Sequence, residues 1–103
     1  MPERSGRRWV PIDSIDWIEA ARDYVLLHTD LRSHLLRITM AALEERLAGS
    51  QLVRVHRSAF VRPDRVEEVN REGRSLSLVL TGGAEVQVGP SYVAATKAAL
   101  GLE

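Results

Sequence analysis

Residues 65–88 read RVEEVNREGRSLSLVLTGGAEVQV, and this stretch decides the class of fold. Leu76, Leu78 and Leu80 recur at every second position, as residues do along one face of a β-strand. Residues that favour tight turns separate this strand from its neighbours. The predicted strands cover residues 65–70, 75–81 and 84–88, with turns at residues 70–73 and 82–83. The stretch therefore predicts an antiparallel sheet.

Upstream, apolar runs with β-favouring residues alternate with short polar breaks. They predict strands over residues 15–20, 24–29, 33–38, 52–55 and 59–61, and an edge strand over residues 9–11. Thr39 would cap a helix over residues 40–47, which Gly49 closes. A second helix would run over residues 90–100 and end at Gly101. The fold class is therefore mainly β (β-rich α+β): an elongated domain of several small antiparallel sheets with two short helices.

The length of 103 residues fits one domain. We expect residues 1–8 to form a flexible arm or an artificial junction, and residues 9–103 to form the folded domain. We expect no secretory signal, because residues 1–8 are charged and no apolar stretch follows them, and no apolar run in the sequence approaches the ~20 residues that a membrane span needs. A cytoplasmic location is expected. Cysteine is absent, which excludes disulfides and thiolate chemistry.

The charges balance, with 14 basic and 14 acidic residues, whereas nucleic-acid-binding domains are usually basic. Lys97 is the single lysine, so 13 of the basic residues are arginine. Arginine carries a planar donor fork that suits phosphates and guanine edges. A genome rich in G and C would also enrich arginine, so this composition alone does not decide the partner.

The most informative motif is VRVHRS at residues 53–58. His56, Arg57 and Ser58 interrupt two apolar strands, which places them on a loop at one end of a sheet. Arg57 could donate two hydrogen bonds to guanine O6 and N7, and His56 could donate to a base or a phosphate. Ser58 could bind a phosphate oxygen. An ordinary exposed polar loop would have the same spacing.

Two other loops carry candidate DNA contacts. Arg22 and Asp23 break a pair of strands; Arg22 could reach a base edge or a phosphate, and Asp23 could orient it or accept from cytosine. A plain turn with a surface ion pair is the alternative. Ser91 lies in residues 89–91, at the start of the last helix, where free N–H groups favour phosphate. Most helix starts bind only water.

Catalysis and metal binding have little support. His28 and His34 could face each other across the turn at residues 29–33, but no third ligand is nearby. His56 and Ser58 would point the same way along a strand, with no carboxylate to orient the imidazole. We therefore predict no enzyme activity, no catalytic or metal site, no cofactor and no small-molecule substrate.

Taken together, these motifs resemble the LytTR family of bacterial DNA-binding domains, the output domains of response regulators. The matching stretches are IDWIEAARDY at residues 15–24, LEERL at 43–47, VRVHRS at 53–58, and the strands and helix at 66–88 and 92–100. The resemblance implies DNA contacts from loops rather than from a recognition helix. Carried over to this chain, the contact regions are Arg22 with Asp23, His56 with Arg57, and residues 89–91.

The resemblance also implies a role in two-component transcription regulation, with two copies bound as a dimer on paired direct repeats of double-stranded DNA and some bending of that DNA. Family members usually follow a phospho-receiver or a membrane segment, so we expect either an excised output domain or a stand-alone regulator. The chain departs from the family at Gly89 and Pro90, where many members carry serine and arginine, at Ala59, where an aromatic residue is usual, and near Arg62, where an asparagine is often found.

Two functions remain open at this point. The leading hypothesis is sequence-specific binding of double-stranded DNA, in which the loops read the major groove. The alternative is a protein-interaction module that modulates another LytTR-type regulator without binding DNA itself. In that case Trp9 and Val10 would form the docking strand.

Overall fold

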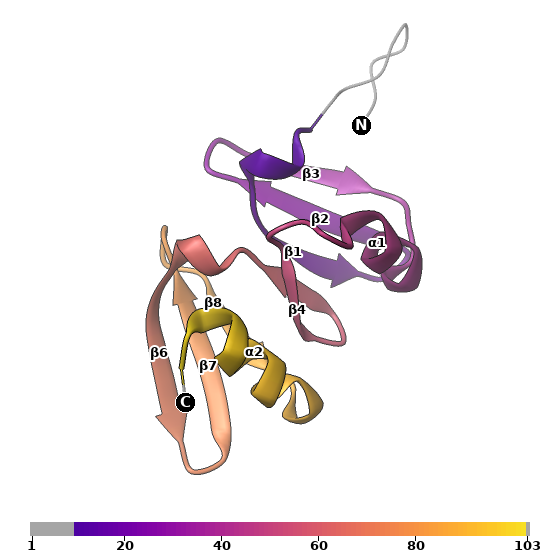
Figure 1. Ribbon diagram of the computed structural model, residues 1–103. Coiled ribbons are helices and arrows are strands. Elements are labelled where there is room, and N and C mark those ends of the chain that lie inside the picture. Colours follow the sequence, from indigo (N-terminus) through magenta and orange to yellow (C-terminus); the bar gives the residue numbers. More distant parts are fainter. Residues whose placement is uncertain (1–9, 103) are drawn as a thin grey trace, which may run out of the picture.

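The computed structural model describes residues 10–102, and it confirms the predicted mainly β fold. Its first sheet has five antiparallel strands in the order β3-β2-β1-β5-β4, and its second has three in the order β6-β7-β8 (Figure 1). The strands are β1 (Ile15–Ala21), β2 (Tyr24–Thr29), β3 (Ser33–Leu36), β4 (Val53–His56), β5 (Ala59–Val61), β6 (Val66–Glu72), β7 (Ser75–Leu80) and β8 (Glu85–Val88). Two α-helices, α1 (Met40–Leu47) and α2 (Val93–Leu100), and three short 3₁₀ turns, Ile12–Ser14, Pro63–Arg65 and Pro90–Tyr92, complete the fold. The principal extents of 50 × 26 × 24 Å make the molecule elongated.

Helix α1 covers one face of the five-stranded sheet. Its buried Leu43 and Leu47 pack against Ile18, Val25 and Phe60 of the strands. The helix begins as predicted, because the Thr39 hydroxyl accepts a hydrogen bond from the Ala42 N–H at 3.1 Å. This cluster is the first of two apolar cores.

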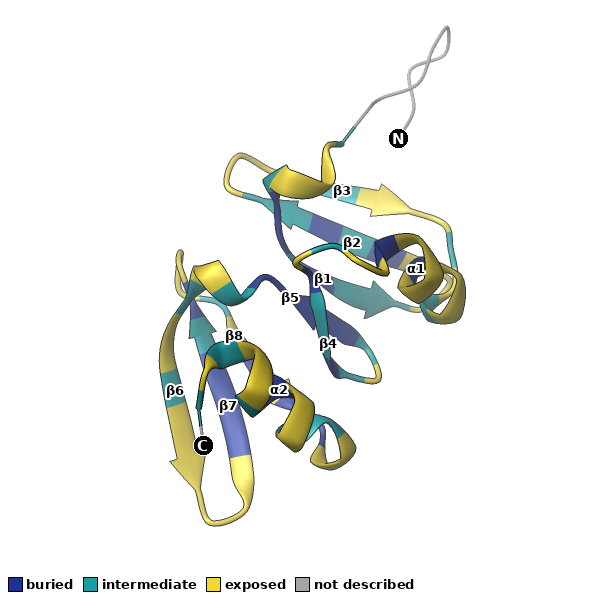
Figure 2. Ribbon diagram, in the orientation of Figure 1, coloured by how far each residue is buried: buried dark blue, intermediate teal, exposed yellow. Residues whose placement is uncertain are grey.

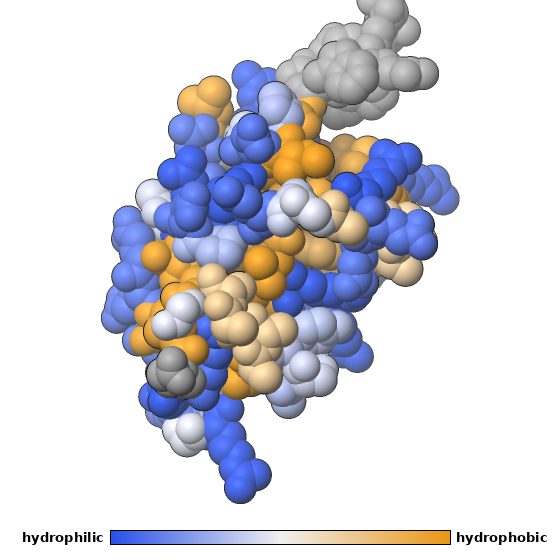
Figure 3. All heavy atoms as spheres, in the orientation of Figure 1, coloured by the Kyte–Doolittle hydropathy of each residue, from blue (hydrophilic) through white to orange (hydrophobic). Residues whose placement is uncertain are grey.

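The second core lies between the small sheet, α2 and the other face of β4 and β5. Leu76, Leu78 and Leu80 are between 0% and 2% exposed, which confirms that the period-two leucines form one buried face. Val55 and Val61 of the five-stranded sheet belong to the same core. Figure 2 shows buried residues along β5 and β7, whereas β6 and the outer side of α2 are mostly exposed. In the view of Figure 3, hydrophilic residues make up most of the rim.

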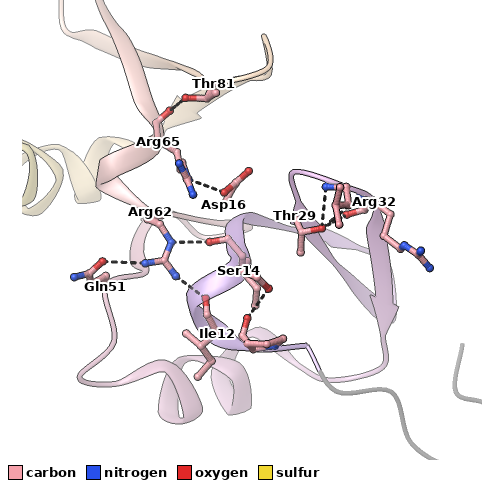
Figure 4. Close-up of polar contacts among 12 residues, drawn as sticks. Ile12, Ser14, Asp16, Thr29, Arg32, Gln51, Arg62, Arg65 and Thr81 are labelled. Atoms are coloured by element: carbon pink, nitrogen blue, oxygen red, sulfur yellow. Dashed lines mark hydrogen bonds and ion pairs between the residues drawn. The ribbon is translucent and has the colours of Figure 1, made fainter.

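Two arginines hold the segment that joins the two sheets (Figure 4). Arg62 is only 5% exposed, and its guanidinium donates to the backbone oxygens of Ile12 and Ile15 and to the Gln51 amide oxygen. Arg65 donates to the Asp16 carboxylate at 2.8 Å. These bonds fasten the chain between β5 and β6 to the 3₁₀ turn before β1, to the first residues of β1 and to Gln51 before β4.

The structure corrects several predicted boundaries. Val10 and Pro11 form no strand, because the chain turns at Pro11, whose oxygen accepts from the Ser14 N–H; Trp9 lies outside the described residues. Strand β3 ends at Leu36 rather than at residue 38, because Ile38 packs against the first core. The final helix begins at Val93, since a 3₁₀ turn occupies Pro90–Tyr92.

The turn predicted at residues 70–73 contains fewer residues than expected. Strand β6 continues to Glu72, which pairs with Ser75, so the turn consists of Gly73 and Arg74. Gly73 has a φ of +61°, the left-handed conformation that suits glycine. Within residues 10–102, no helix has the length and apolar character that crossing a membrane requires.

Candidate nucleic-acid interface

The three predicted contact loops converge at one end of the five-stranded sheet. Strand β5 runs antiparallel to β1 and pairs Ala59 with Glu19, which brings the β4–β5 turn beside the end of β1. The Ala20 N–H donates to the Ser58 oxygen at 2.9 Å. The third loop joins them because the Gly89 N–H donates to the Val55 oxygen at 2.8 Å. Sheet topology therefore assembles one surface from loops that are far apart in sequence (Figure 1).

The β1–β2 turn contains only Arg22 and Asp23, because Ala21 pairs with Tyr24. Arg22 has a φ of +61°, an unusual conformation for a residue with a side chain. Both turn residues are exposed, and within residues 10–102 neither side chain has a hydrogen-bond or ion-pair partner. The Arg22–Asp23 ion pair considered from the sequence therefore does not form, and the guanidinium of Arg22 is available to a ligand.

The β4–β5 turn is organised by the imidazole of His56. The Ser58 N–H lies 3.1 Å from His56 Nδ1, and the Ser58 hydroxyl lies 2.8 Å from the same nitrogen. A backbone amide can only donate, so Nδ1 is the acceptor and the neutral ring carries its proton on Nε2. His56 is half-buried, with Nε2–H as its remaining donor.

Arg57 lies at the exposed tip of this turn. Its guanidinium has no hydrogen-bond or ion-pair partner anywhere in residues 10–102, whereas its backbone oxygen accepts from Arg54. An arginine whose backbone is held and whose donor fork is free can present two parallel N–H groups to a guanine edge.

Arg54 supports the turn from below, a role that the sequence did not reveal. Its guanidinium donates to the backbone oxygens of Arg57 and His56 and to the Glu44 carboxylate. The same group lies 5.7 Å from the centre of the Phe60 ring and 5.8 Å from that of Tyr92. Arg54 therefore joins β4, β5, α1 and the third loop, although it lies in the VRVHRS motif without any sign of that role.

The third loop is packed tightly beneath His56. Gly89 is buried with an ordinary φ of −67°, and a Cβ there would lie 3.1 Å from Tyr92 Cδ2 and 3.5 Å from His56 Cδ2. Space, rather than backbone strain, therefore favours glycine at this position. Ser91 is exposed in the 3₁₀ turn that precedes α2. Of the predicted phosphate contacts in this loop, the hydroxyl of Ser91 is the side-chain group available.

The histidine pair considered for metal binding is not brought together. His34 pairs with Leu27 while His28 pairs with Ser33, so the two imidazoles lie on opposite faces of the sheet. His28 bonds to the Glu19 carboxylate and the Ser33 hydroxyl, both at 2.7 Å, and stacks on Trp17. Within residues 10–102, no three potential ligand side chains gather around a metal position.

A shallow groove of about 210 Å³ borders the β4–β5 turn on the side of the small sheet. Its lining includes His56 and Ser58 together with the carboxylates of Glu19 and Glu85. Negative charge opposes phosphate, so these two carboxylates set a boundary to any nucleic-acid surface on this side.

The chain is therefore a small β-rich domain in which three loops meet at one end of a five-stranded sheet. The family model of the LytTr DNA-binding domain matches residues 5–101, so the chain belongs to this family, whose general role is DNA binding in transcription regulation. A solved structure has a similar fold: the LytTr DNA-binding domain of a putative methyl-accepting/DNA response regulator from Bacillus cereus. The match has a TM-score of 0.82 at 20% identity and covers 97% of this chain and 93% of that one. No curated protein matched the chain.

Proposed function

We propose that this domain binds double-stranded DNA in a sequence-specific manner and reads the major groove with its three converging loops. The observation that carries the proposal is the free guanidinium of Arg57 on an internally bonded turn. Arg22 lies at the same edge of the sheet, and its guanidinium is also free. Two unpaired guanidinium groups at one sheet edge suit an anionic partner with defined acceptors.

The spacing of the turns supports insertion into one groove. The β1–β2 and β4–β5 turns are separated by two strand positions in the sheet order, which is about 10 Å. The major groove of B-DNA is about 12 Å wide, so both turns fit within it. A minor groove of about 6 Å would admit only one of them.

Each residue has a chemically distinct part in this proposal. Arg57 reads guanine O6 and N7, and His56 donates from Nε2 to a base or a phosphate. Arg22 reaches a base edge or a phosphate, while Asp23 accepts from cytosine N4. The Ser91 hydroxyl positions the domain through a backbone phosphate, and the Ser58 hydroxyl does the same by turning its one proton from His56 Nδ1 to a phosphate oxygen.

The net charge of zero bears on how the domain would reach useful affinity. Electrostatic attraction supplies most non-specific binding to DNA, and this chain has little of it to offer. We propose that two copies bind as a dimer on paired direct repeats, because two linked binding events raise the total affinity without new contacts. The setting for this role is the bacterial cytoplasm, as the output of a two-component system.

The decisive experiment selects binding sites from random duplexes and follows the selected site through a salt titration. We expect enrichment of a defined motif and a linear fall of log affinity with log salt. Arg57→Ala should weaken binding by about 1–3 kcal/mol and relax the preference at one base pair. Arg32→Ala is the matched control, because Arg32 is exposed at the opposite end of the sheet, beyond β2. Equal binding by the two variants would contradict the proposed reading of the β4–β5 turn.

The alternative function, modulation of another LytTr regulator without DNA contact, has one supporting observation. Strand β3 is an edge strand, and Leu31, Leu35 and Leu36 at that edge are 85%, 49% and 37% exposed. Apolar edge strands can pair with another protein. Selection that enriches no sequence, together with a stable complex between this domain and a partner regulator, would favour this alternative.

A further inference from the structure

A hollow of about 550 Å³ lies beside the β1–β2 turn, away from the groove that Glu19 and Glu85 line. The β1–β2 turn forms one wall and residues 37–40, between β3 and α1, form the other. Its charged side chains are Arg22, Arg37 and Asp23, so the hollow carries net positive charge.

Arg37 is the charged residue of this hollow that was not predicted from the sequence as a candidate contact. Its guanidinium carbon lies 5.9 Å from the centre of the Tyr24 ring, and no carboxylate within residues 10–102 pairs with it. Stacking on an aromatic face restrains the guanidinium and leaves its N–H donors free at the rim. Ile38 packs against the first core and the Thr39 side chain caps α1, so the backbone that carries Arg37 is fixed on its C-terminal side.

The sheet order places Arg37 at the same end of the five-stranded sheet as Arg22 and Arg57. Leu36, the last residue of β3, pairs with Val25, and the adjacent Tyr24 pairs with Ala21. The end of β3 is therefore level with the β1–β2 turn. Across this end of the sheet, from β4 to β3, the exposed arginines are Arg57, Arg22 and Arg37.

The distance across this end of the sheet, from the β4–β5 turn to β3, determines what Arg37 can reach. The β4–β5 turn and β3 are three and a half strand positions apart, or about 17 Å. A major groove of about 12 Å cannot hold both ends of such an edge. With the β4–β5 turn at the bases, the end of β3 must lie over the sugar–phosphate wall of the groove.

We propose that Arg37 binds a backbone phosphate of the duplex at that wall, with the hollow receiving the phosphate and Tyr24 holding the guanidinium in place. The inference rests on the proposed function, because it needs the β4–β5 turn inside the groove. The planar fork of arginine donates two parallel N–H groups to phosphate oxygens. Arg37 is thus a positioning contact that fixes the domain on the duplex without reading sequence.

The test compares the wild-type domain, Arg37→Gln and the control Arg32→Gln on the selected duplex. Loss of one phosphate contact should lower the slope of log affinity against log salt by about 0.9. Affinity near physiological salt should fall about threefold to tenfold, with the same base preference, because the lost contact is electrostatic. Arg32→Gln should match the wild type, and circular dichroism should show all three proteins equally folded.

A second arm locates the contact by neutralising single phosphates with methylphosphonate. One position should weaken wild-type binding and leave Arg37→Gln nearly unaffected, since the variant has already lost that contact. An unchanged salt slope for Arg37→Gln, or an altered base preference, would overturn the assignment while leaving the proposed function intact. Failure of the wild-type domain to select any duplex would instead overturn the proposed function, and the Arg37 contact with it.

Discussion

The β1–β2 turn and the β4–β5 turn lie at the same end of one sheet, yet they differ in how their conformation is stabilised. In the β4–β5 turn, His56 bonds to Ser58 across the turn, and Arg54 holds the backbone oxygens of His56 and Arg57. In the β1–β2 turn, the side chains of both residues are exposed and have no partner within residues 10–102. One turn is braced by side chains, and the other is held only by its strand pairing.

Under the proposed function, this contrast predicts different roles for the two turns in binding DNA. Two hydrogen bonds to the edge of one nucleotide base require an arginine whose backbone is held in place. A rigid group also loses less entropy on binding. The braced turn meets that requirement for Arg57. The β1–β2 turn leaves Arg22 free to follow a base edge or a phosphate whose position varies between sites. We therefore expect specificity to depend chiefly on the β4–β5 turn.

The largest effect on stability should come from Arg54→Ala, which removes the side chain that braces the β4–β5 turn. The substitution removes the hydrogen bonds to His56 and Arg57, the bond to Glu44 and the packing on Phe60. We expect the free energy of unfolding to fall by about 2 kcal/mol, measured by urea denaturation. DNA affinity should fall about tenfold although Arg54 is not expected to touch DNA, because the free Arg57 fork loses its fixed base.

Glu44→Gln is the control for this prediction. Glu44 is 55% exposed, so its ion pair with Arg54 should contribute less than about 0.5 kcal/mol to stability and nothing to DNA affinity. Arg54→Met keeps much of the packing but loses the donors, so it should lose affinity like Arg54→Ala with a smaller loss of stability. Wild-type affinity in Arg54→Met would show that the hydrogen bonds to the turn are not what prepares it for binding.

The sequence predicted most of the fold because the leucines of β7 alternate and Thr39 lies at a cap position. It also placed Arg57 and Ser58 on a loop, since polar residues lie between two apolar runs; His56, predicted on the same loop, is instead the last residue of β4, where it pairs with Ala59. It could not predict the brace, because Arg54 acts on backbone oxygens and aromatic rings that only the tertiary fold brings near. The buried Arg62 was missed for the same reason: its acceptors include oxygens of Ile12 and Ile15, some 50 and 47 residues away.

A smaller effect, of opposite sign on stability and binding, is expected for Arg22→Gly in the unbraced turn. Glycine adopts a φ of +61° without the steric cost that a side chain incurs. The free energy of unfolding should therefore rise by about 0.5–1 kcal/mol. DNA affinity should fall about fivefold because a guanidinium of the proposed interface is lost. Arg22→Ala is the matched comparison, since alanine loses the same contact but keeps the strained backbone. Equal stability of the two variants would show that the turn carries no such strain.

The smallest effect is expected for Ser58→Ala, which tests what holds the braced turn at its centre. The substitution removes the hydroxyl 2.8 Å from His56 Nδ1 but keeps the backbone N–H that donates to the same nitrogen. Stability should change by less than about 0.5 kcal/mol, and affinity should fall only about twofold to threefold for all sequences, because a phosphate contact carries no base information. Nitrogen-15 NMR of the imidazole should still show the proton on Nε2. A proton that moves to Nδ1 in Ser58→Ala would show that the hydroxyl, and not the amide, fixes the tautomer. The brace would then depend on a side chain in the turn itself, rather than on the backbone that Arg54 holds in place.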